Sequence, residues 1–150
     1  IVRALMTSTN RPSVTVLLVQ KEVAERLAAG PGDMSILAVS AQIYADVELG
    51  EIVPAALFTP PPKVDSAVVT LRSHAHSILK DVDEQLFFRV VRAGFSAKRK
   101  KLRSSLAGGL GLDKPQVETL LLSVAISPDQ RAEDLSIENW RRLTETYRDR

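Results

Sequence analysis

The chain has 150 residues, 45% hydrophobic and 25% charged, with a formal net charge of +2 at pH 7, no cysteine and two histidines. This composition is typical of a globular protein of one ordinary domain or two small ones. It excludes disulfides and thiolate metal sites, leaves too few histidines for an all-histidine metal site, and has no apolar run of the roughly 18–20 residues that cross a bilayer. No secretory signal is visible. We therefore expect a cytoplasmic protein without a metal site or a membrane anchor.

The first part of the chain predicts helices and strands in alternation. Apolar residues over 1–8 are typical of the end of a helix, and the nearly continuous apolar run 14–19 favours a strand buried on both faces, as in a parallel sheet covered by helices. Helical spacing follows over 21–29 and over 35–44. Because the pattern starts directly at Ile1, we expect the carboxy-terminal portion of a larger protein.

Two further strands are expected over 47–53 and 64–71, on either side of a proline-rich loop. Consecutive prolines at 60–62 favour a stiff, extended connection. The order of elements indicates the second half of an α/β sheet that ends in an antiparallel hairpin. By itself this half has too few strands to close a core, so its uncovered surfaces would allow a homodimer of the chain in a crystal.

Residues 74–81 look like a linker, in which His74 and His76 are expected to be solvated. The rest of the chain has helical periodicity, with predicted caps at Asp83, Asp113 and Ser136. The glycine cluster 108–111 is expected to end the second of these helices; it follows a helix and not a strand, so it is no phosphate loop. We therefore expect two domains, over 1–75 and 76–150, the second small and all-helical. Charge pairs in 131–135 are expected to tie the last helices together.

The highest local concentration of charge lies in the helical half. Seven basic residues and no acidic one occur from position 89 to 103: Arg89, Arg92, Lys98, Arg99, Lys100, Lys101 and Arg103. We expect the run to be helical, which would place Arg99 and Arg103 on one face, and Phe95 and Ser96 stand beside it. Such a cluster is typical of a protein that binds a polyanion, although a run of lysine and arginine is as often a solvated face.

Two other segments are candidates for a site. Phe58 stands before the prolines, where a rigid aromatic side chain can stack on a base. Its spacing alone favours a side chain that is buried in the core under the loop, as a core plug. A polyproline ligand is a third alternative, which the flanking strands disfavour. Gln20 and Lys21 lie where a strand gives way to a helix, the usual place for sites in α/β sheets. On spacing alone, helix-start chemistry with surface ion pairs is the favoured explanation of that segment.

These segments together resemble one family, the ribosomal RNA small-subunit adenine dimethyltransferases. The matching motifs are Gln-Lys-Glu-Val-Ala-x-Arg-Leu at 20–27, Phe-x-Pro-x-Pro-Lys-Val-Asp-Ser-Ala-Val at 58–68, Phe-Ser-x-x-Arg-Lys-x-Leu-Arg-x-Ser-Leu at 95–106 and Arg-Ala-Glu-Asp-Leu-Ser at 131–136. They span nearly the whole chain. The second and third motifs also favour the small-subunit enzymes over the related large-subunit macrolide-resistance methyltransferases.

The resemblance implies a Rossmann-like methyltransferase sheet followed by a small helical RNA-binding domain. The family transfers methyl groups from S-adenosylmethionine to N6 of two adjacent adenosines near the 3′ end of small-subunit ribosomal RNA, and has a role in small-subunit assembly. The resemblance implies that Phe58 stacks on the target adenine and that the basic residues bind RNA. It also places Gln20 and Lys21 at the rim of the site. The partner would be small-subunit RNA or a 30S-type particle.

The chain also departs from the family pattern. The glycine-rich cofactor loop, the acidic residue for the ribose and the Asn-Leu-Pro-Tyr motif do not occur in it, and Met34-Ser35 replaces the usual Tyr-Gly. We therefore expect no cofactor-binding residue in this chain and no methyl transfer by the chain alone. The alternatives are a non-catalytic RNA-binding or ribosome-assembly module and, less in keeping with the strands, a helical DNA-binding protein.

Overall fold

The computed structural model describes residues 2–150; Ile1, expected at the start of the first helix, lies outside the described residues. The chain divides into two compact units, one formed by residues up to Ala29 with Leu37–Ile78, the other by Gly30–Ile36 with Leu79–Arg150. Residues 30–36 therefore depart from the expected division at 75/76. They join the second unit because the backbone N–H groups of Gly32 and Met34 both donate to the carbonyl of Glu133, at 2.9 and 3.1 Å.

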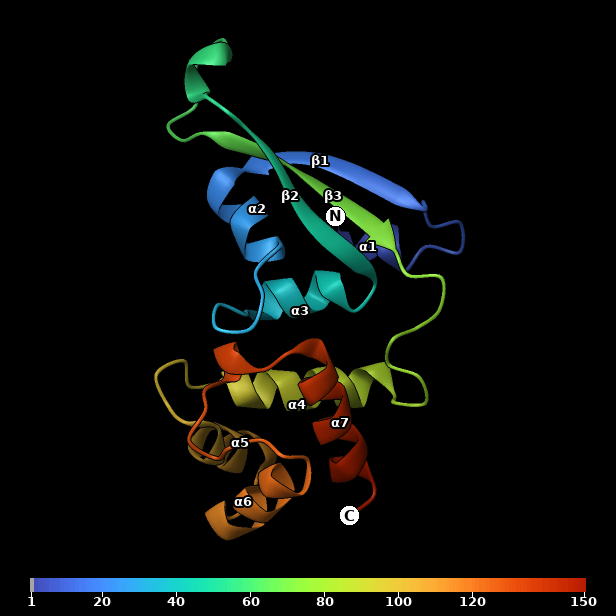
Figure 1. Ribbon diagram of the computed structural model, residues 1–150, viewed down its shortest axis with the longest axis vertical. Coiled ribbons are helices and arrows are strands. Elements are labelled where there is room, and N and C mark those ends of the chain that lie inside the picture. Colours follow the sequence, from blue (N-terminus) through green and yellow to red (C-terminus); the bar gives the residue numbers. More distant parts are fainter. Residues whose placement is uncertain (1) are drawn as a thin grey trace. The chain divides into compact units, whose positions relative to one another are not determined.

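The first unit is built on a three-stranded sheet (Figure 1). Its strands β1 (Val14–Gln20), β3 (Ser66–Ser73) and β2 (Ala45–Val53) lie side by side in that order, and both pairs are antiparallel. The predicted hairpin of the last two strands is confirmed, with a register shift between Leu49 and Ile52.

Helices cover one face of this sheet. They are α1 (Val2–Met6), α2 (Lys21–Leu27) and α3 (Ile36–Gln42). Because side chains alternate between the faces of a strand, Ala67, Val69 and Leu71 of β3 all point into the core, where they pack with Met6 and Leu27 among others.

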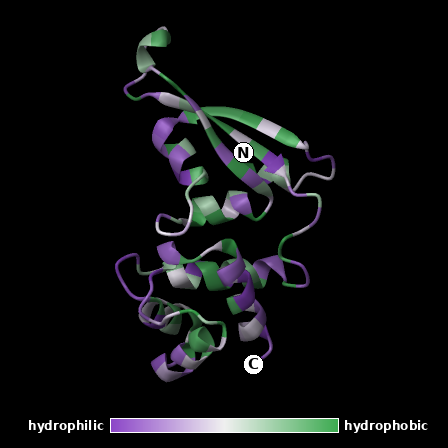
Figure 2. Ribbon diagram, in the orientation of Figure 1, coloured by the Kyte–Doolittle hydropathy of each residue, from purple (hydrophilic) through white to green (hydrophobic). Residues whose placement is uncertain are grey.

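The expectation that 14–19 is buried on both faces is wrong for this chain. β1 pairs with β3 along one edge only, and its outward side chains Val16 and Leu18 are 61% and 51% exposed. Figure 2 shows hydrophobic residues along most of this strand. The apolar run predicted a strand covered on both faces, but the helices of this unit cover only one face of β1.

The second unit is helical. It contains α4 (Glu84–Phe95), α5 (Leu102–Leu110), α6 (Lys114–Ser123), the 3-10 turn η2 (Ala132–Asp134) and α7 (Ile137–Arg148). The three predicted caps are confirmed: Asp83 and Asp113 each accept from a backbone N–H at 2.8 Å, and the Ser136 hydroxyl accepts at 3.1 Å. Trp140, Phe87, Leu106, Leu121 and Leu143 are fully buried in its core.

The glycine cluster ends helix α5, as expected, but only at its last residue. The helix continues through Gly108 and Gly109 to Leu110, and Gly111 ends it with a left-handed φ of 69°. Gly109 faces α4, where an added Cβ would lie 2.5 Å from the Cβ and 2.6 Å from the Cα of Ala93. The glycine is therefore part of a close helix–helix contact.

Two smaller expectations are also corrected. The side chain of His74 is only 16% exposed, and its Nε2 lies 3.0 Å from the carbonyl oxygen of Gln42, so it is not simply solvated. Within 131–135, Arg131 pairs with Glu133 at 3.7 Å, and its backbone N–H donates to Asp134 at 2.8 Å. These contacts are local to η2 and do not join the last helices.

Helix α7 contains a buried arginine, Arg141, which pairs with two more exposed acidic residues. The guanidinium of Arg141 is 2.7 Å from Glu138 and 3.1 Å from Glu145. The hydrogen bond from Arg141 lowers the pKa of Glu138, and the same bond raises the pKa of Arg141. Among residues 2–150, no helix is long and apolar enough to cross a membrane, and no group of three or more His, Cys, Asp and Glu could hold a metal ion.

Candidate nucleic-acid interface

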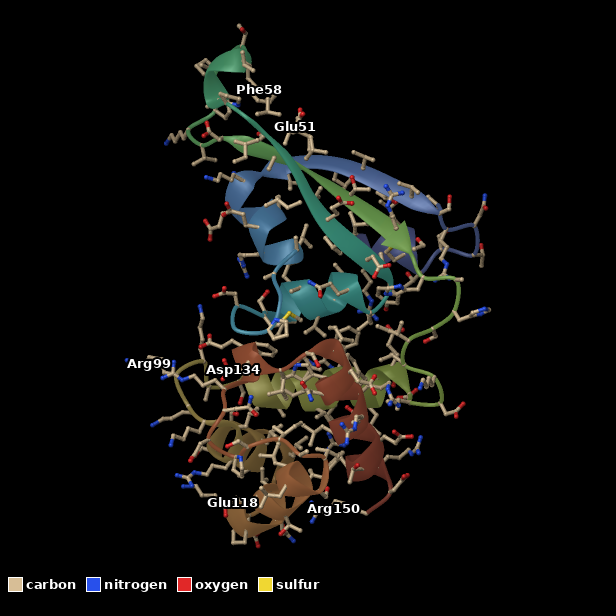
Figure 3. The ribbon with its side chains drawn as sticks, in the orientation of Figure 1. Glu51, Phe58, Arg99, Glu118, Asp134 and Arg150 are labelled. Carbon is tan, nitrogen blue, oxygen red and sulfur yellow. The ribbon has the colours of Figure 1, made fainter. Side chains whose placement is uncertain are left out.

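The loop between β2 and β3 carries Phe58. It does not begin as an extended connection: β2 is followed by a 3-10 turn, η1 (Ala55–Leu57), and the backbone N–H of Phe58 donates to the carbonyl of Ala55 at 3.2 Å. Phe58 itself is extended and half-buried, and it lies outside the core cluster. It is therefore no core plug. Figure 3 shows it on the loop beyond the end of β2.

The same loop holds an exposed apolar residue that the sequence analysis did not single out. Leu57, directly before Phe58, is 74% exposed, the highest value among the large apolar side chains of the described residues. An apolar residue next to the aromatic in a proline-flanked loop is the signal that could have indicated it. The loop thus presents an apolar surface to solvent beside Phe58.

The register of the sheet brings the two candidate segments of this unit to one end. Gln20 of β1 and Val53 of β2 both pair with Ser66, the first residue of β3. The residue before it, Asp65, contacts both segments: its carboxylate accepts from the N–H of Ala55 at 2.9 Å, and its carbonyl accepts from the N–H of Lys21 at 3.0 Å. The start of α2 and the Phe58 loop are therefore joined by direct hydrogen bonds.

The side chain of Lys21 has an acidic neighbour on its own helix. Its Nζ is 3.9 Å from Glu25, and both side chains are about half exposed, at 43% and 49%. This is the surface ion pair that the simpler interpretation of the segment predicts. Surface pairs of this kind contribute about 0–1 kcal/mol and leave the lysine able to exchange partners.

The basic run is not one continuous helix, which corrects the expectation: residues 98–101 lie in a loop, and only Arg103 lies on a helix, α5. Helix α4 ends at Phe95, where the Ser96 hydroxyl donates to the carbonyl of Ala93 at 2.7 Å, and α5 starts only at Leu102. Arg99 and Arg103 therefore share no helical face. Phe95 packs against the buried Trp140, with ring centroids 5.6 Å apart, so the aromatic residue beside the charges anchors the helix within its own unit.

The five cations of the run fall into two groups. Lys101 lies 2.9 Å from Asp129, and Arg103 lies 3.4 Å from Glu118 and 3.7 Å from Asp129. The hydrogen bond from Lys101 lowers the pKa of Asp129, so this carboxylate stays charged. The other three are exposed and have no ion pair with any described residue: Lys98, Arg99 and Lys100. We refer to these three as the open cations.

Two more cations lie on the helix that leads into this loop. Arg89 and Arg92 are exposed on α4, three residues apart and thus on one face, while Val90 and Val91 are buried. The helix is amphipathic, so its polar face is available to solvent. Figure 3 shows Arg99 on the loop beyond the end of this helix.

Comparison with known proteins gives the family. The model of the ribosomal RNA adenine dimethylase family matches residues 1–149. A ribosomal RNA small subunit methyltransferase A of Dehalococcoides mccartyi strain CBDB1 is 41% identical over 147 residues, which cover 98% of this chain and 50% of that protein. The protein of the same description from Desulfitobacterium hafniense strain DSM 10664 is 48% identical over 134 residues, 87% of this chain and 47% of that protein.

Solved structures show the same fold. A dimethyladenosine transferase from Plasmodium falciparum superposes with a TM-score of 0.79 at 24% identity, covering 97% of this chain and 60% of that one. The 23S rRNA methyltransferase ErmE gives a TM-score of 0.69 at 23% identity, covering 95% and 57%. The chain thus spans about half the length of the curated relatives it matches. On the match over 1–149 and these relatives, the chain belongs to the ribosomal RNA adenine dimethylase family.

Proposed function

We propose that this chain is the carboxy-terminal part of an S-adenosylmethionine-dependent enzyme that dimethylates N6 of two adjacent adenosines near the 3′ end of small-subunit ribosomal RNA and acts in small-subunit assembly. The observation that carries the proposal is an aromatic residue outside the core at one end of the sheet, Phe58, in a chain that also has a loop with three open cations. The aromatic side chain can stack on a base, and the cations can bind the phosphates of an RNA backbone.

Phe58 is the residue that stacks on the target base. An exocyclic adenine amine is a poor nucleophile because its lone pair is delocalised into the ring, so the enzyme has to hold it in a defined orientation. A base taken out of its stack is held by aromatic or apolar side chains. Phe58, on a loop tied down at Ala55 by Asp65, would provide one wall for the adenine, with Gln20 and Lys21 at the rim.

The basic residues hold the RNA without reading its sequence. Each cation that replaces a phosphate counterion adds to affinity and to its salt dependence. Lys98, Arg99 and Lys100 serve this role directly. Lys101 and Arg103 can do so only by exchanging their acidic partners, and Arg89 and Arg92 extend the surface along α4.

Residues 2–150 include no glycine-rich loop of the kind that holds S-adenosylmethionine, the methyl donor that the family implies. A loop that binds a nucleotide-type cofactor follows directly after a strand and has glycines at its turn. Here Gly30 and Gly32 follow α2, and the glycines at 108–111 lie within α5 or at its end. Strand β1 ends at Gln20, and α2 begins at the next residue, Lys21. No step of the reaction is therefore assigned to a cofactor contact in this chain.

The test is Phe58→Ala in a protein of the relatives' full length. Stacking on a base is worth about 1–3 kcal/mol, so we expect methyl transfer to under-methylated small subunits to fall about 5- to 150-fold, with RNA binding nearly unchanged. Phe58→Tyr keeps the ring and should restore most of the rate. Unchanged turnover in Phe58→Ala would refute the assignment, and binding without any methyl transfer by the full-length protein would favour the RNA-binding assembly module.

A further inference from the structure

We propose that Asp65 is a positioning residue that fixes the Phe58 loop against the rest of the sheet end. The inference rests on the proposed function, since it concerns how Phe58 is presented to the base. The residues directly before η1 and α2, Pro54 and Gln20, make no side-chain capping hydrogen bond.

The first N–H groups of a helical turn have no partner within the turn and need an acceptor from elsewhere. Asp65 supplies one to each element: its Oδ1 accepts from Ala55 at 2.9 Å, and its carbonyl oxygen accepts from Lys21 at 3.0 Å. The side-chain bond is charge-assisted, which makes it stronger than a neutral one. One residue directly before β3 thus caps both η1 and α2.

The turn that Asp65 holds determines where Phe58 lies. Within η1, the N–H of Leu57 donates to Pro54 at 3.1 Å and that of Phe58 donates to Ala55 at 3.2 Å. A shift of Ala55 therefore moves Phe58 with it. Asp65 itself is exposed and lies outside the core cluster, so its contribution is to the position of the loop more than to packing.

The two bonds can be separated by mutation. Asp65→Ala removes the bond to Ala55 and leaves the backbone bond to Lys21, whereas Asp65→Asn keeps an acceptor oxygen on a side chain of the same shape. In the full-length protein we expect Asp65→Ala to lower kcat for methyl transfer about 10- to 100-fold, the size of effect that small misplacements cause, with affinity for small-subunit RNA within about twofold, since the open cations are untouched. The kcat of Asp65→Asn should stay within about threefold of that of the unmodified protein.

A double-mutant cycle with Phe58→Ala shows whether Asp65 acts through Phe58. We expect Asp65→Ala to have no further effect once the ring is gone. Multiplicative effects, or a loss in Asp65→Asn as large as in Asp65→Ala, would overturn the inference. If Phe58→Ala is impaired and Asp65→Ala is not, the inference fails while the proposed function stands; if Phe58→Ala is fully active, the proposed function itself fails.

The matched control is Asp46→Ala. Asp46 is also an aspartate of this unit, but it lies near the opposite end of β2 and its side chain is 85% exposed. This variant should leave kcat unchanged. An equal fall in kcat for Asp46→Ala and Asp65→Ala would mean that loss of an acidic charge from the unit, and not the bond to Ala55, causes the effect, and it would overturn the proposal.

Discussion

At the scale of single residues, the cations of the basic run are not equivalent. Lys98, Arg99 and Lys100 are exposed and have no ion pair with a described residue, whereas Lys101 and Arg103 pair with Asp129 and Glu118. A phosphate that binds an open cation displaces water and counterions. A phosphate that binds Lys101 also has to displace a carboxylate 2.9 Å away, so less of the interaction energy remains for RNA.

This difference gives a prediction about salt dependence. Each phosphate contact with single-stranded nucleic acid contributes about 0.7 to the slope of log affinity against log salt. Replacing Lys98, Arg99 and Lys100 by glutamine in the full-length protein should therefore weaken binding to small-subunit RNA and flatten the slope by about 2. Replacing Lys101 and Arg103 should flatten it by less per residue. The measurement is a binding titration at several salt concentrations.

Asp129→Asn supplies the control for this interpretation. It keeps the shape of the side chain and removes the charge that holds Lys101, so RNA affinity should rise and the slope should steepen. Equal slopes per residue for the two groups of cations would contradict the division into open and paired charges. A slope that no replacement changes would mean that the whole run is a solvated face.

Residue roles could be predicted from the sequence only where the residues are neighbours in it. Phe58 and the basic run stand out because an aromatic before prolines and a cluster of charges are visible in a short window. Asp65 does not stand out, because its partners Ala55 and Lys21 are 10 and 44 positions away and the contacts involve backbone atoms. The pairing of Lys101 with Asp129 is hidden in the same way, over 28 positions.

At the scale of elements, the basic run shows how tertiary contacts override local preference. Lysine, arginine and alanine favour helix, and neither proline nor glycine interrupts 95–107. In a continuous helix the N–H of Leu102 would donate to Lys98. Here it donates to the carbonyl of Gln130 at 2.8 Å, and that of Arg103 donates to Pro128 at 3.3 Å. These two bonds fix the start of α5 at Leu102 and leave the cations at 98–101 in a loop.

The adjacent glycines of α5 give a matched pair of variants. An added Cβ at Gly109 would lie 2.6 Å from the backbone of Ala93, whereas one at Gly108 would meet nothing within 4 Å. Gly109→Ala should therefore push α5 from α4 and lower the free energy of unfolding by about 1–3 kcal/mol. Gly108→Ala should raise it by about 0.5–1 kcal/mol, because alanine is the better helix former. Denaturant unfolding measures both, and shifts of the same sign would contradict the close contact.

At the scale of the whole molecule, the sequence predicted which helices and strands each unit contains. It predicted less well what packs against those strands. Caps, helical periodicity and the β2–β3 hairpin are local patterns, and the structure has them. The apolar run 14–19 correctly indicated a strand, but a run of apolar residues cannot say what covers it. In this chain Val14, Val16 and Leu18 are 44%, 61% and 51% exposed.

This exposed face leads to a prediction about a protein of the relatives' full length, in which we expect further residues to cover β1. The 150 residues contain no cysteine, so a single introduced cysteine can report accessibility, with any cysteine in the rest of the full-length protein replaced by serine. Val16→Cys should react fast with a thiol reagent in the 150-residue chain and slowly in the full-length protein. Val69→Cys, on the covered face of β3 at 0% exposure, should be slow in both. Equal fast labelling of Val16→Cys in both proteins would show that the face stays open.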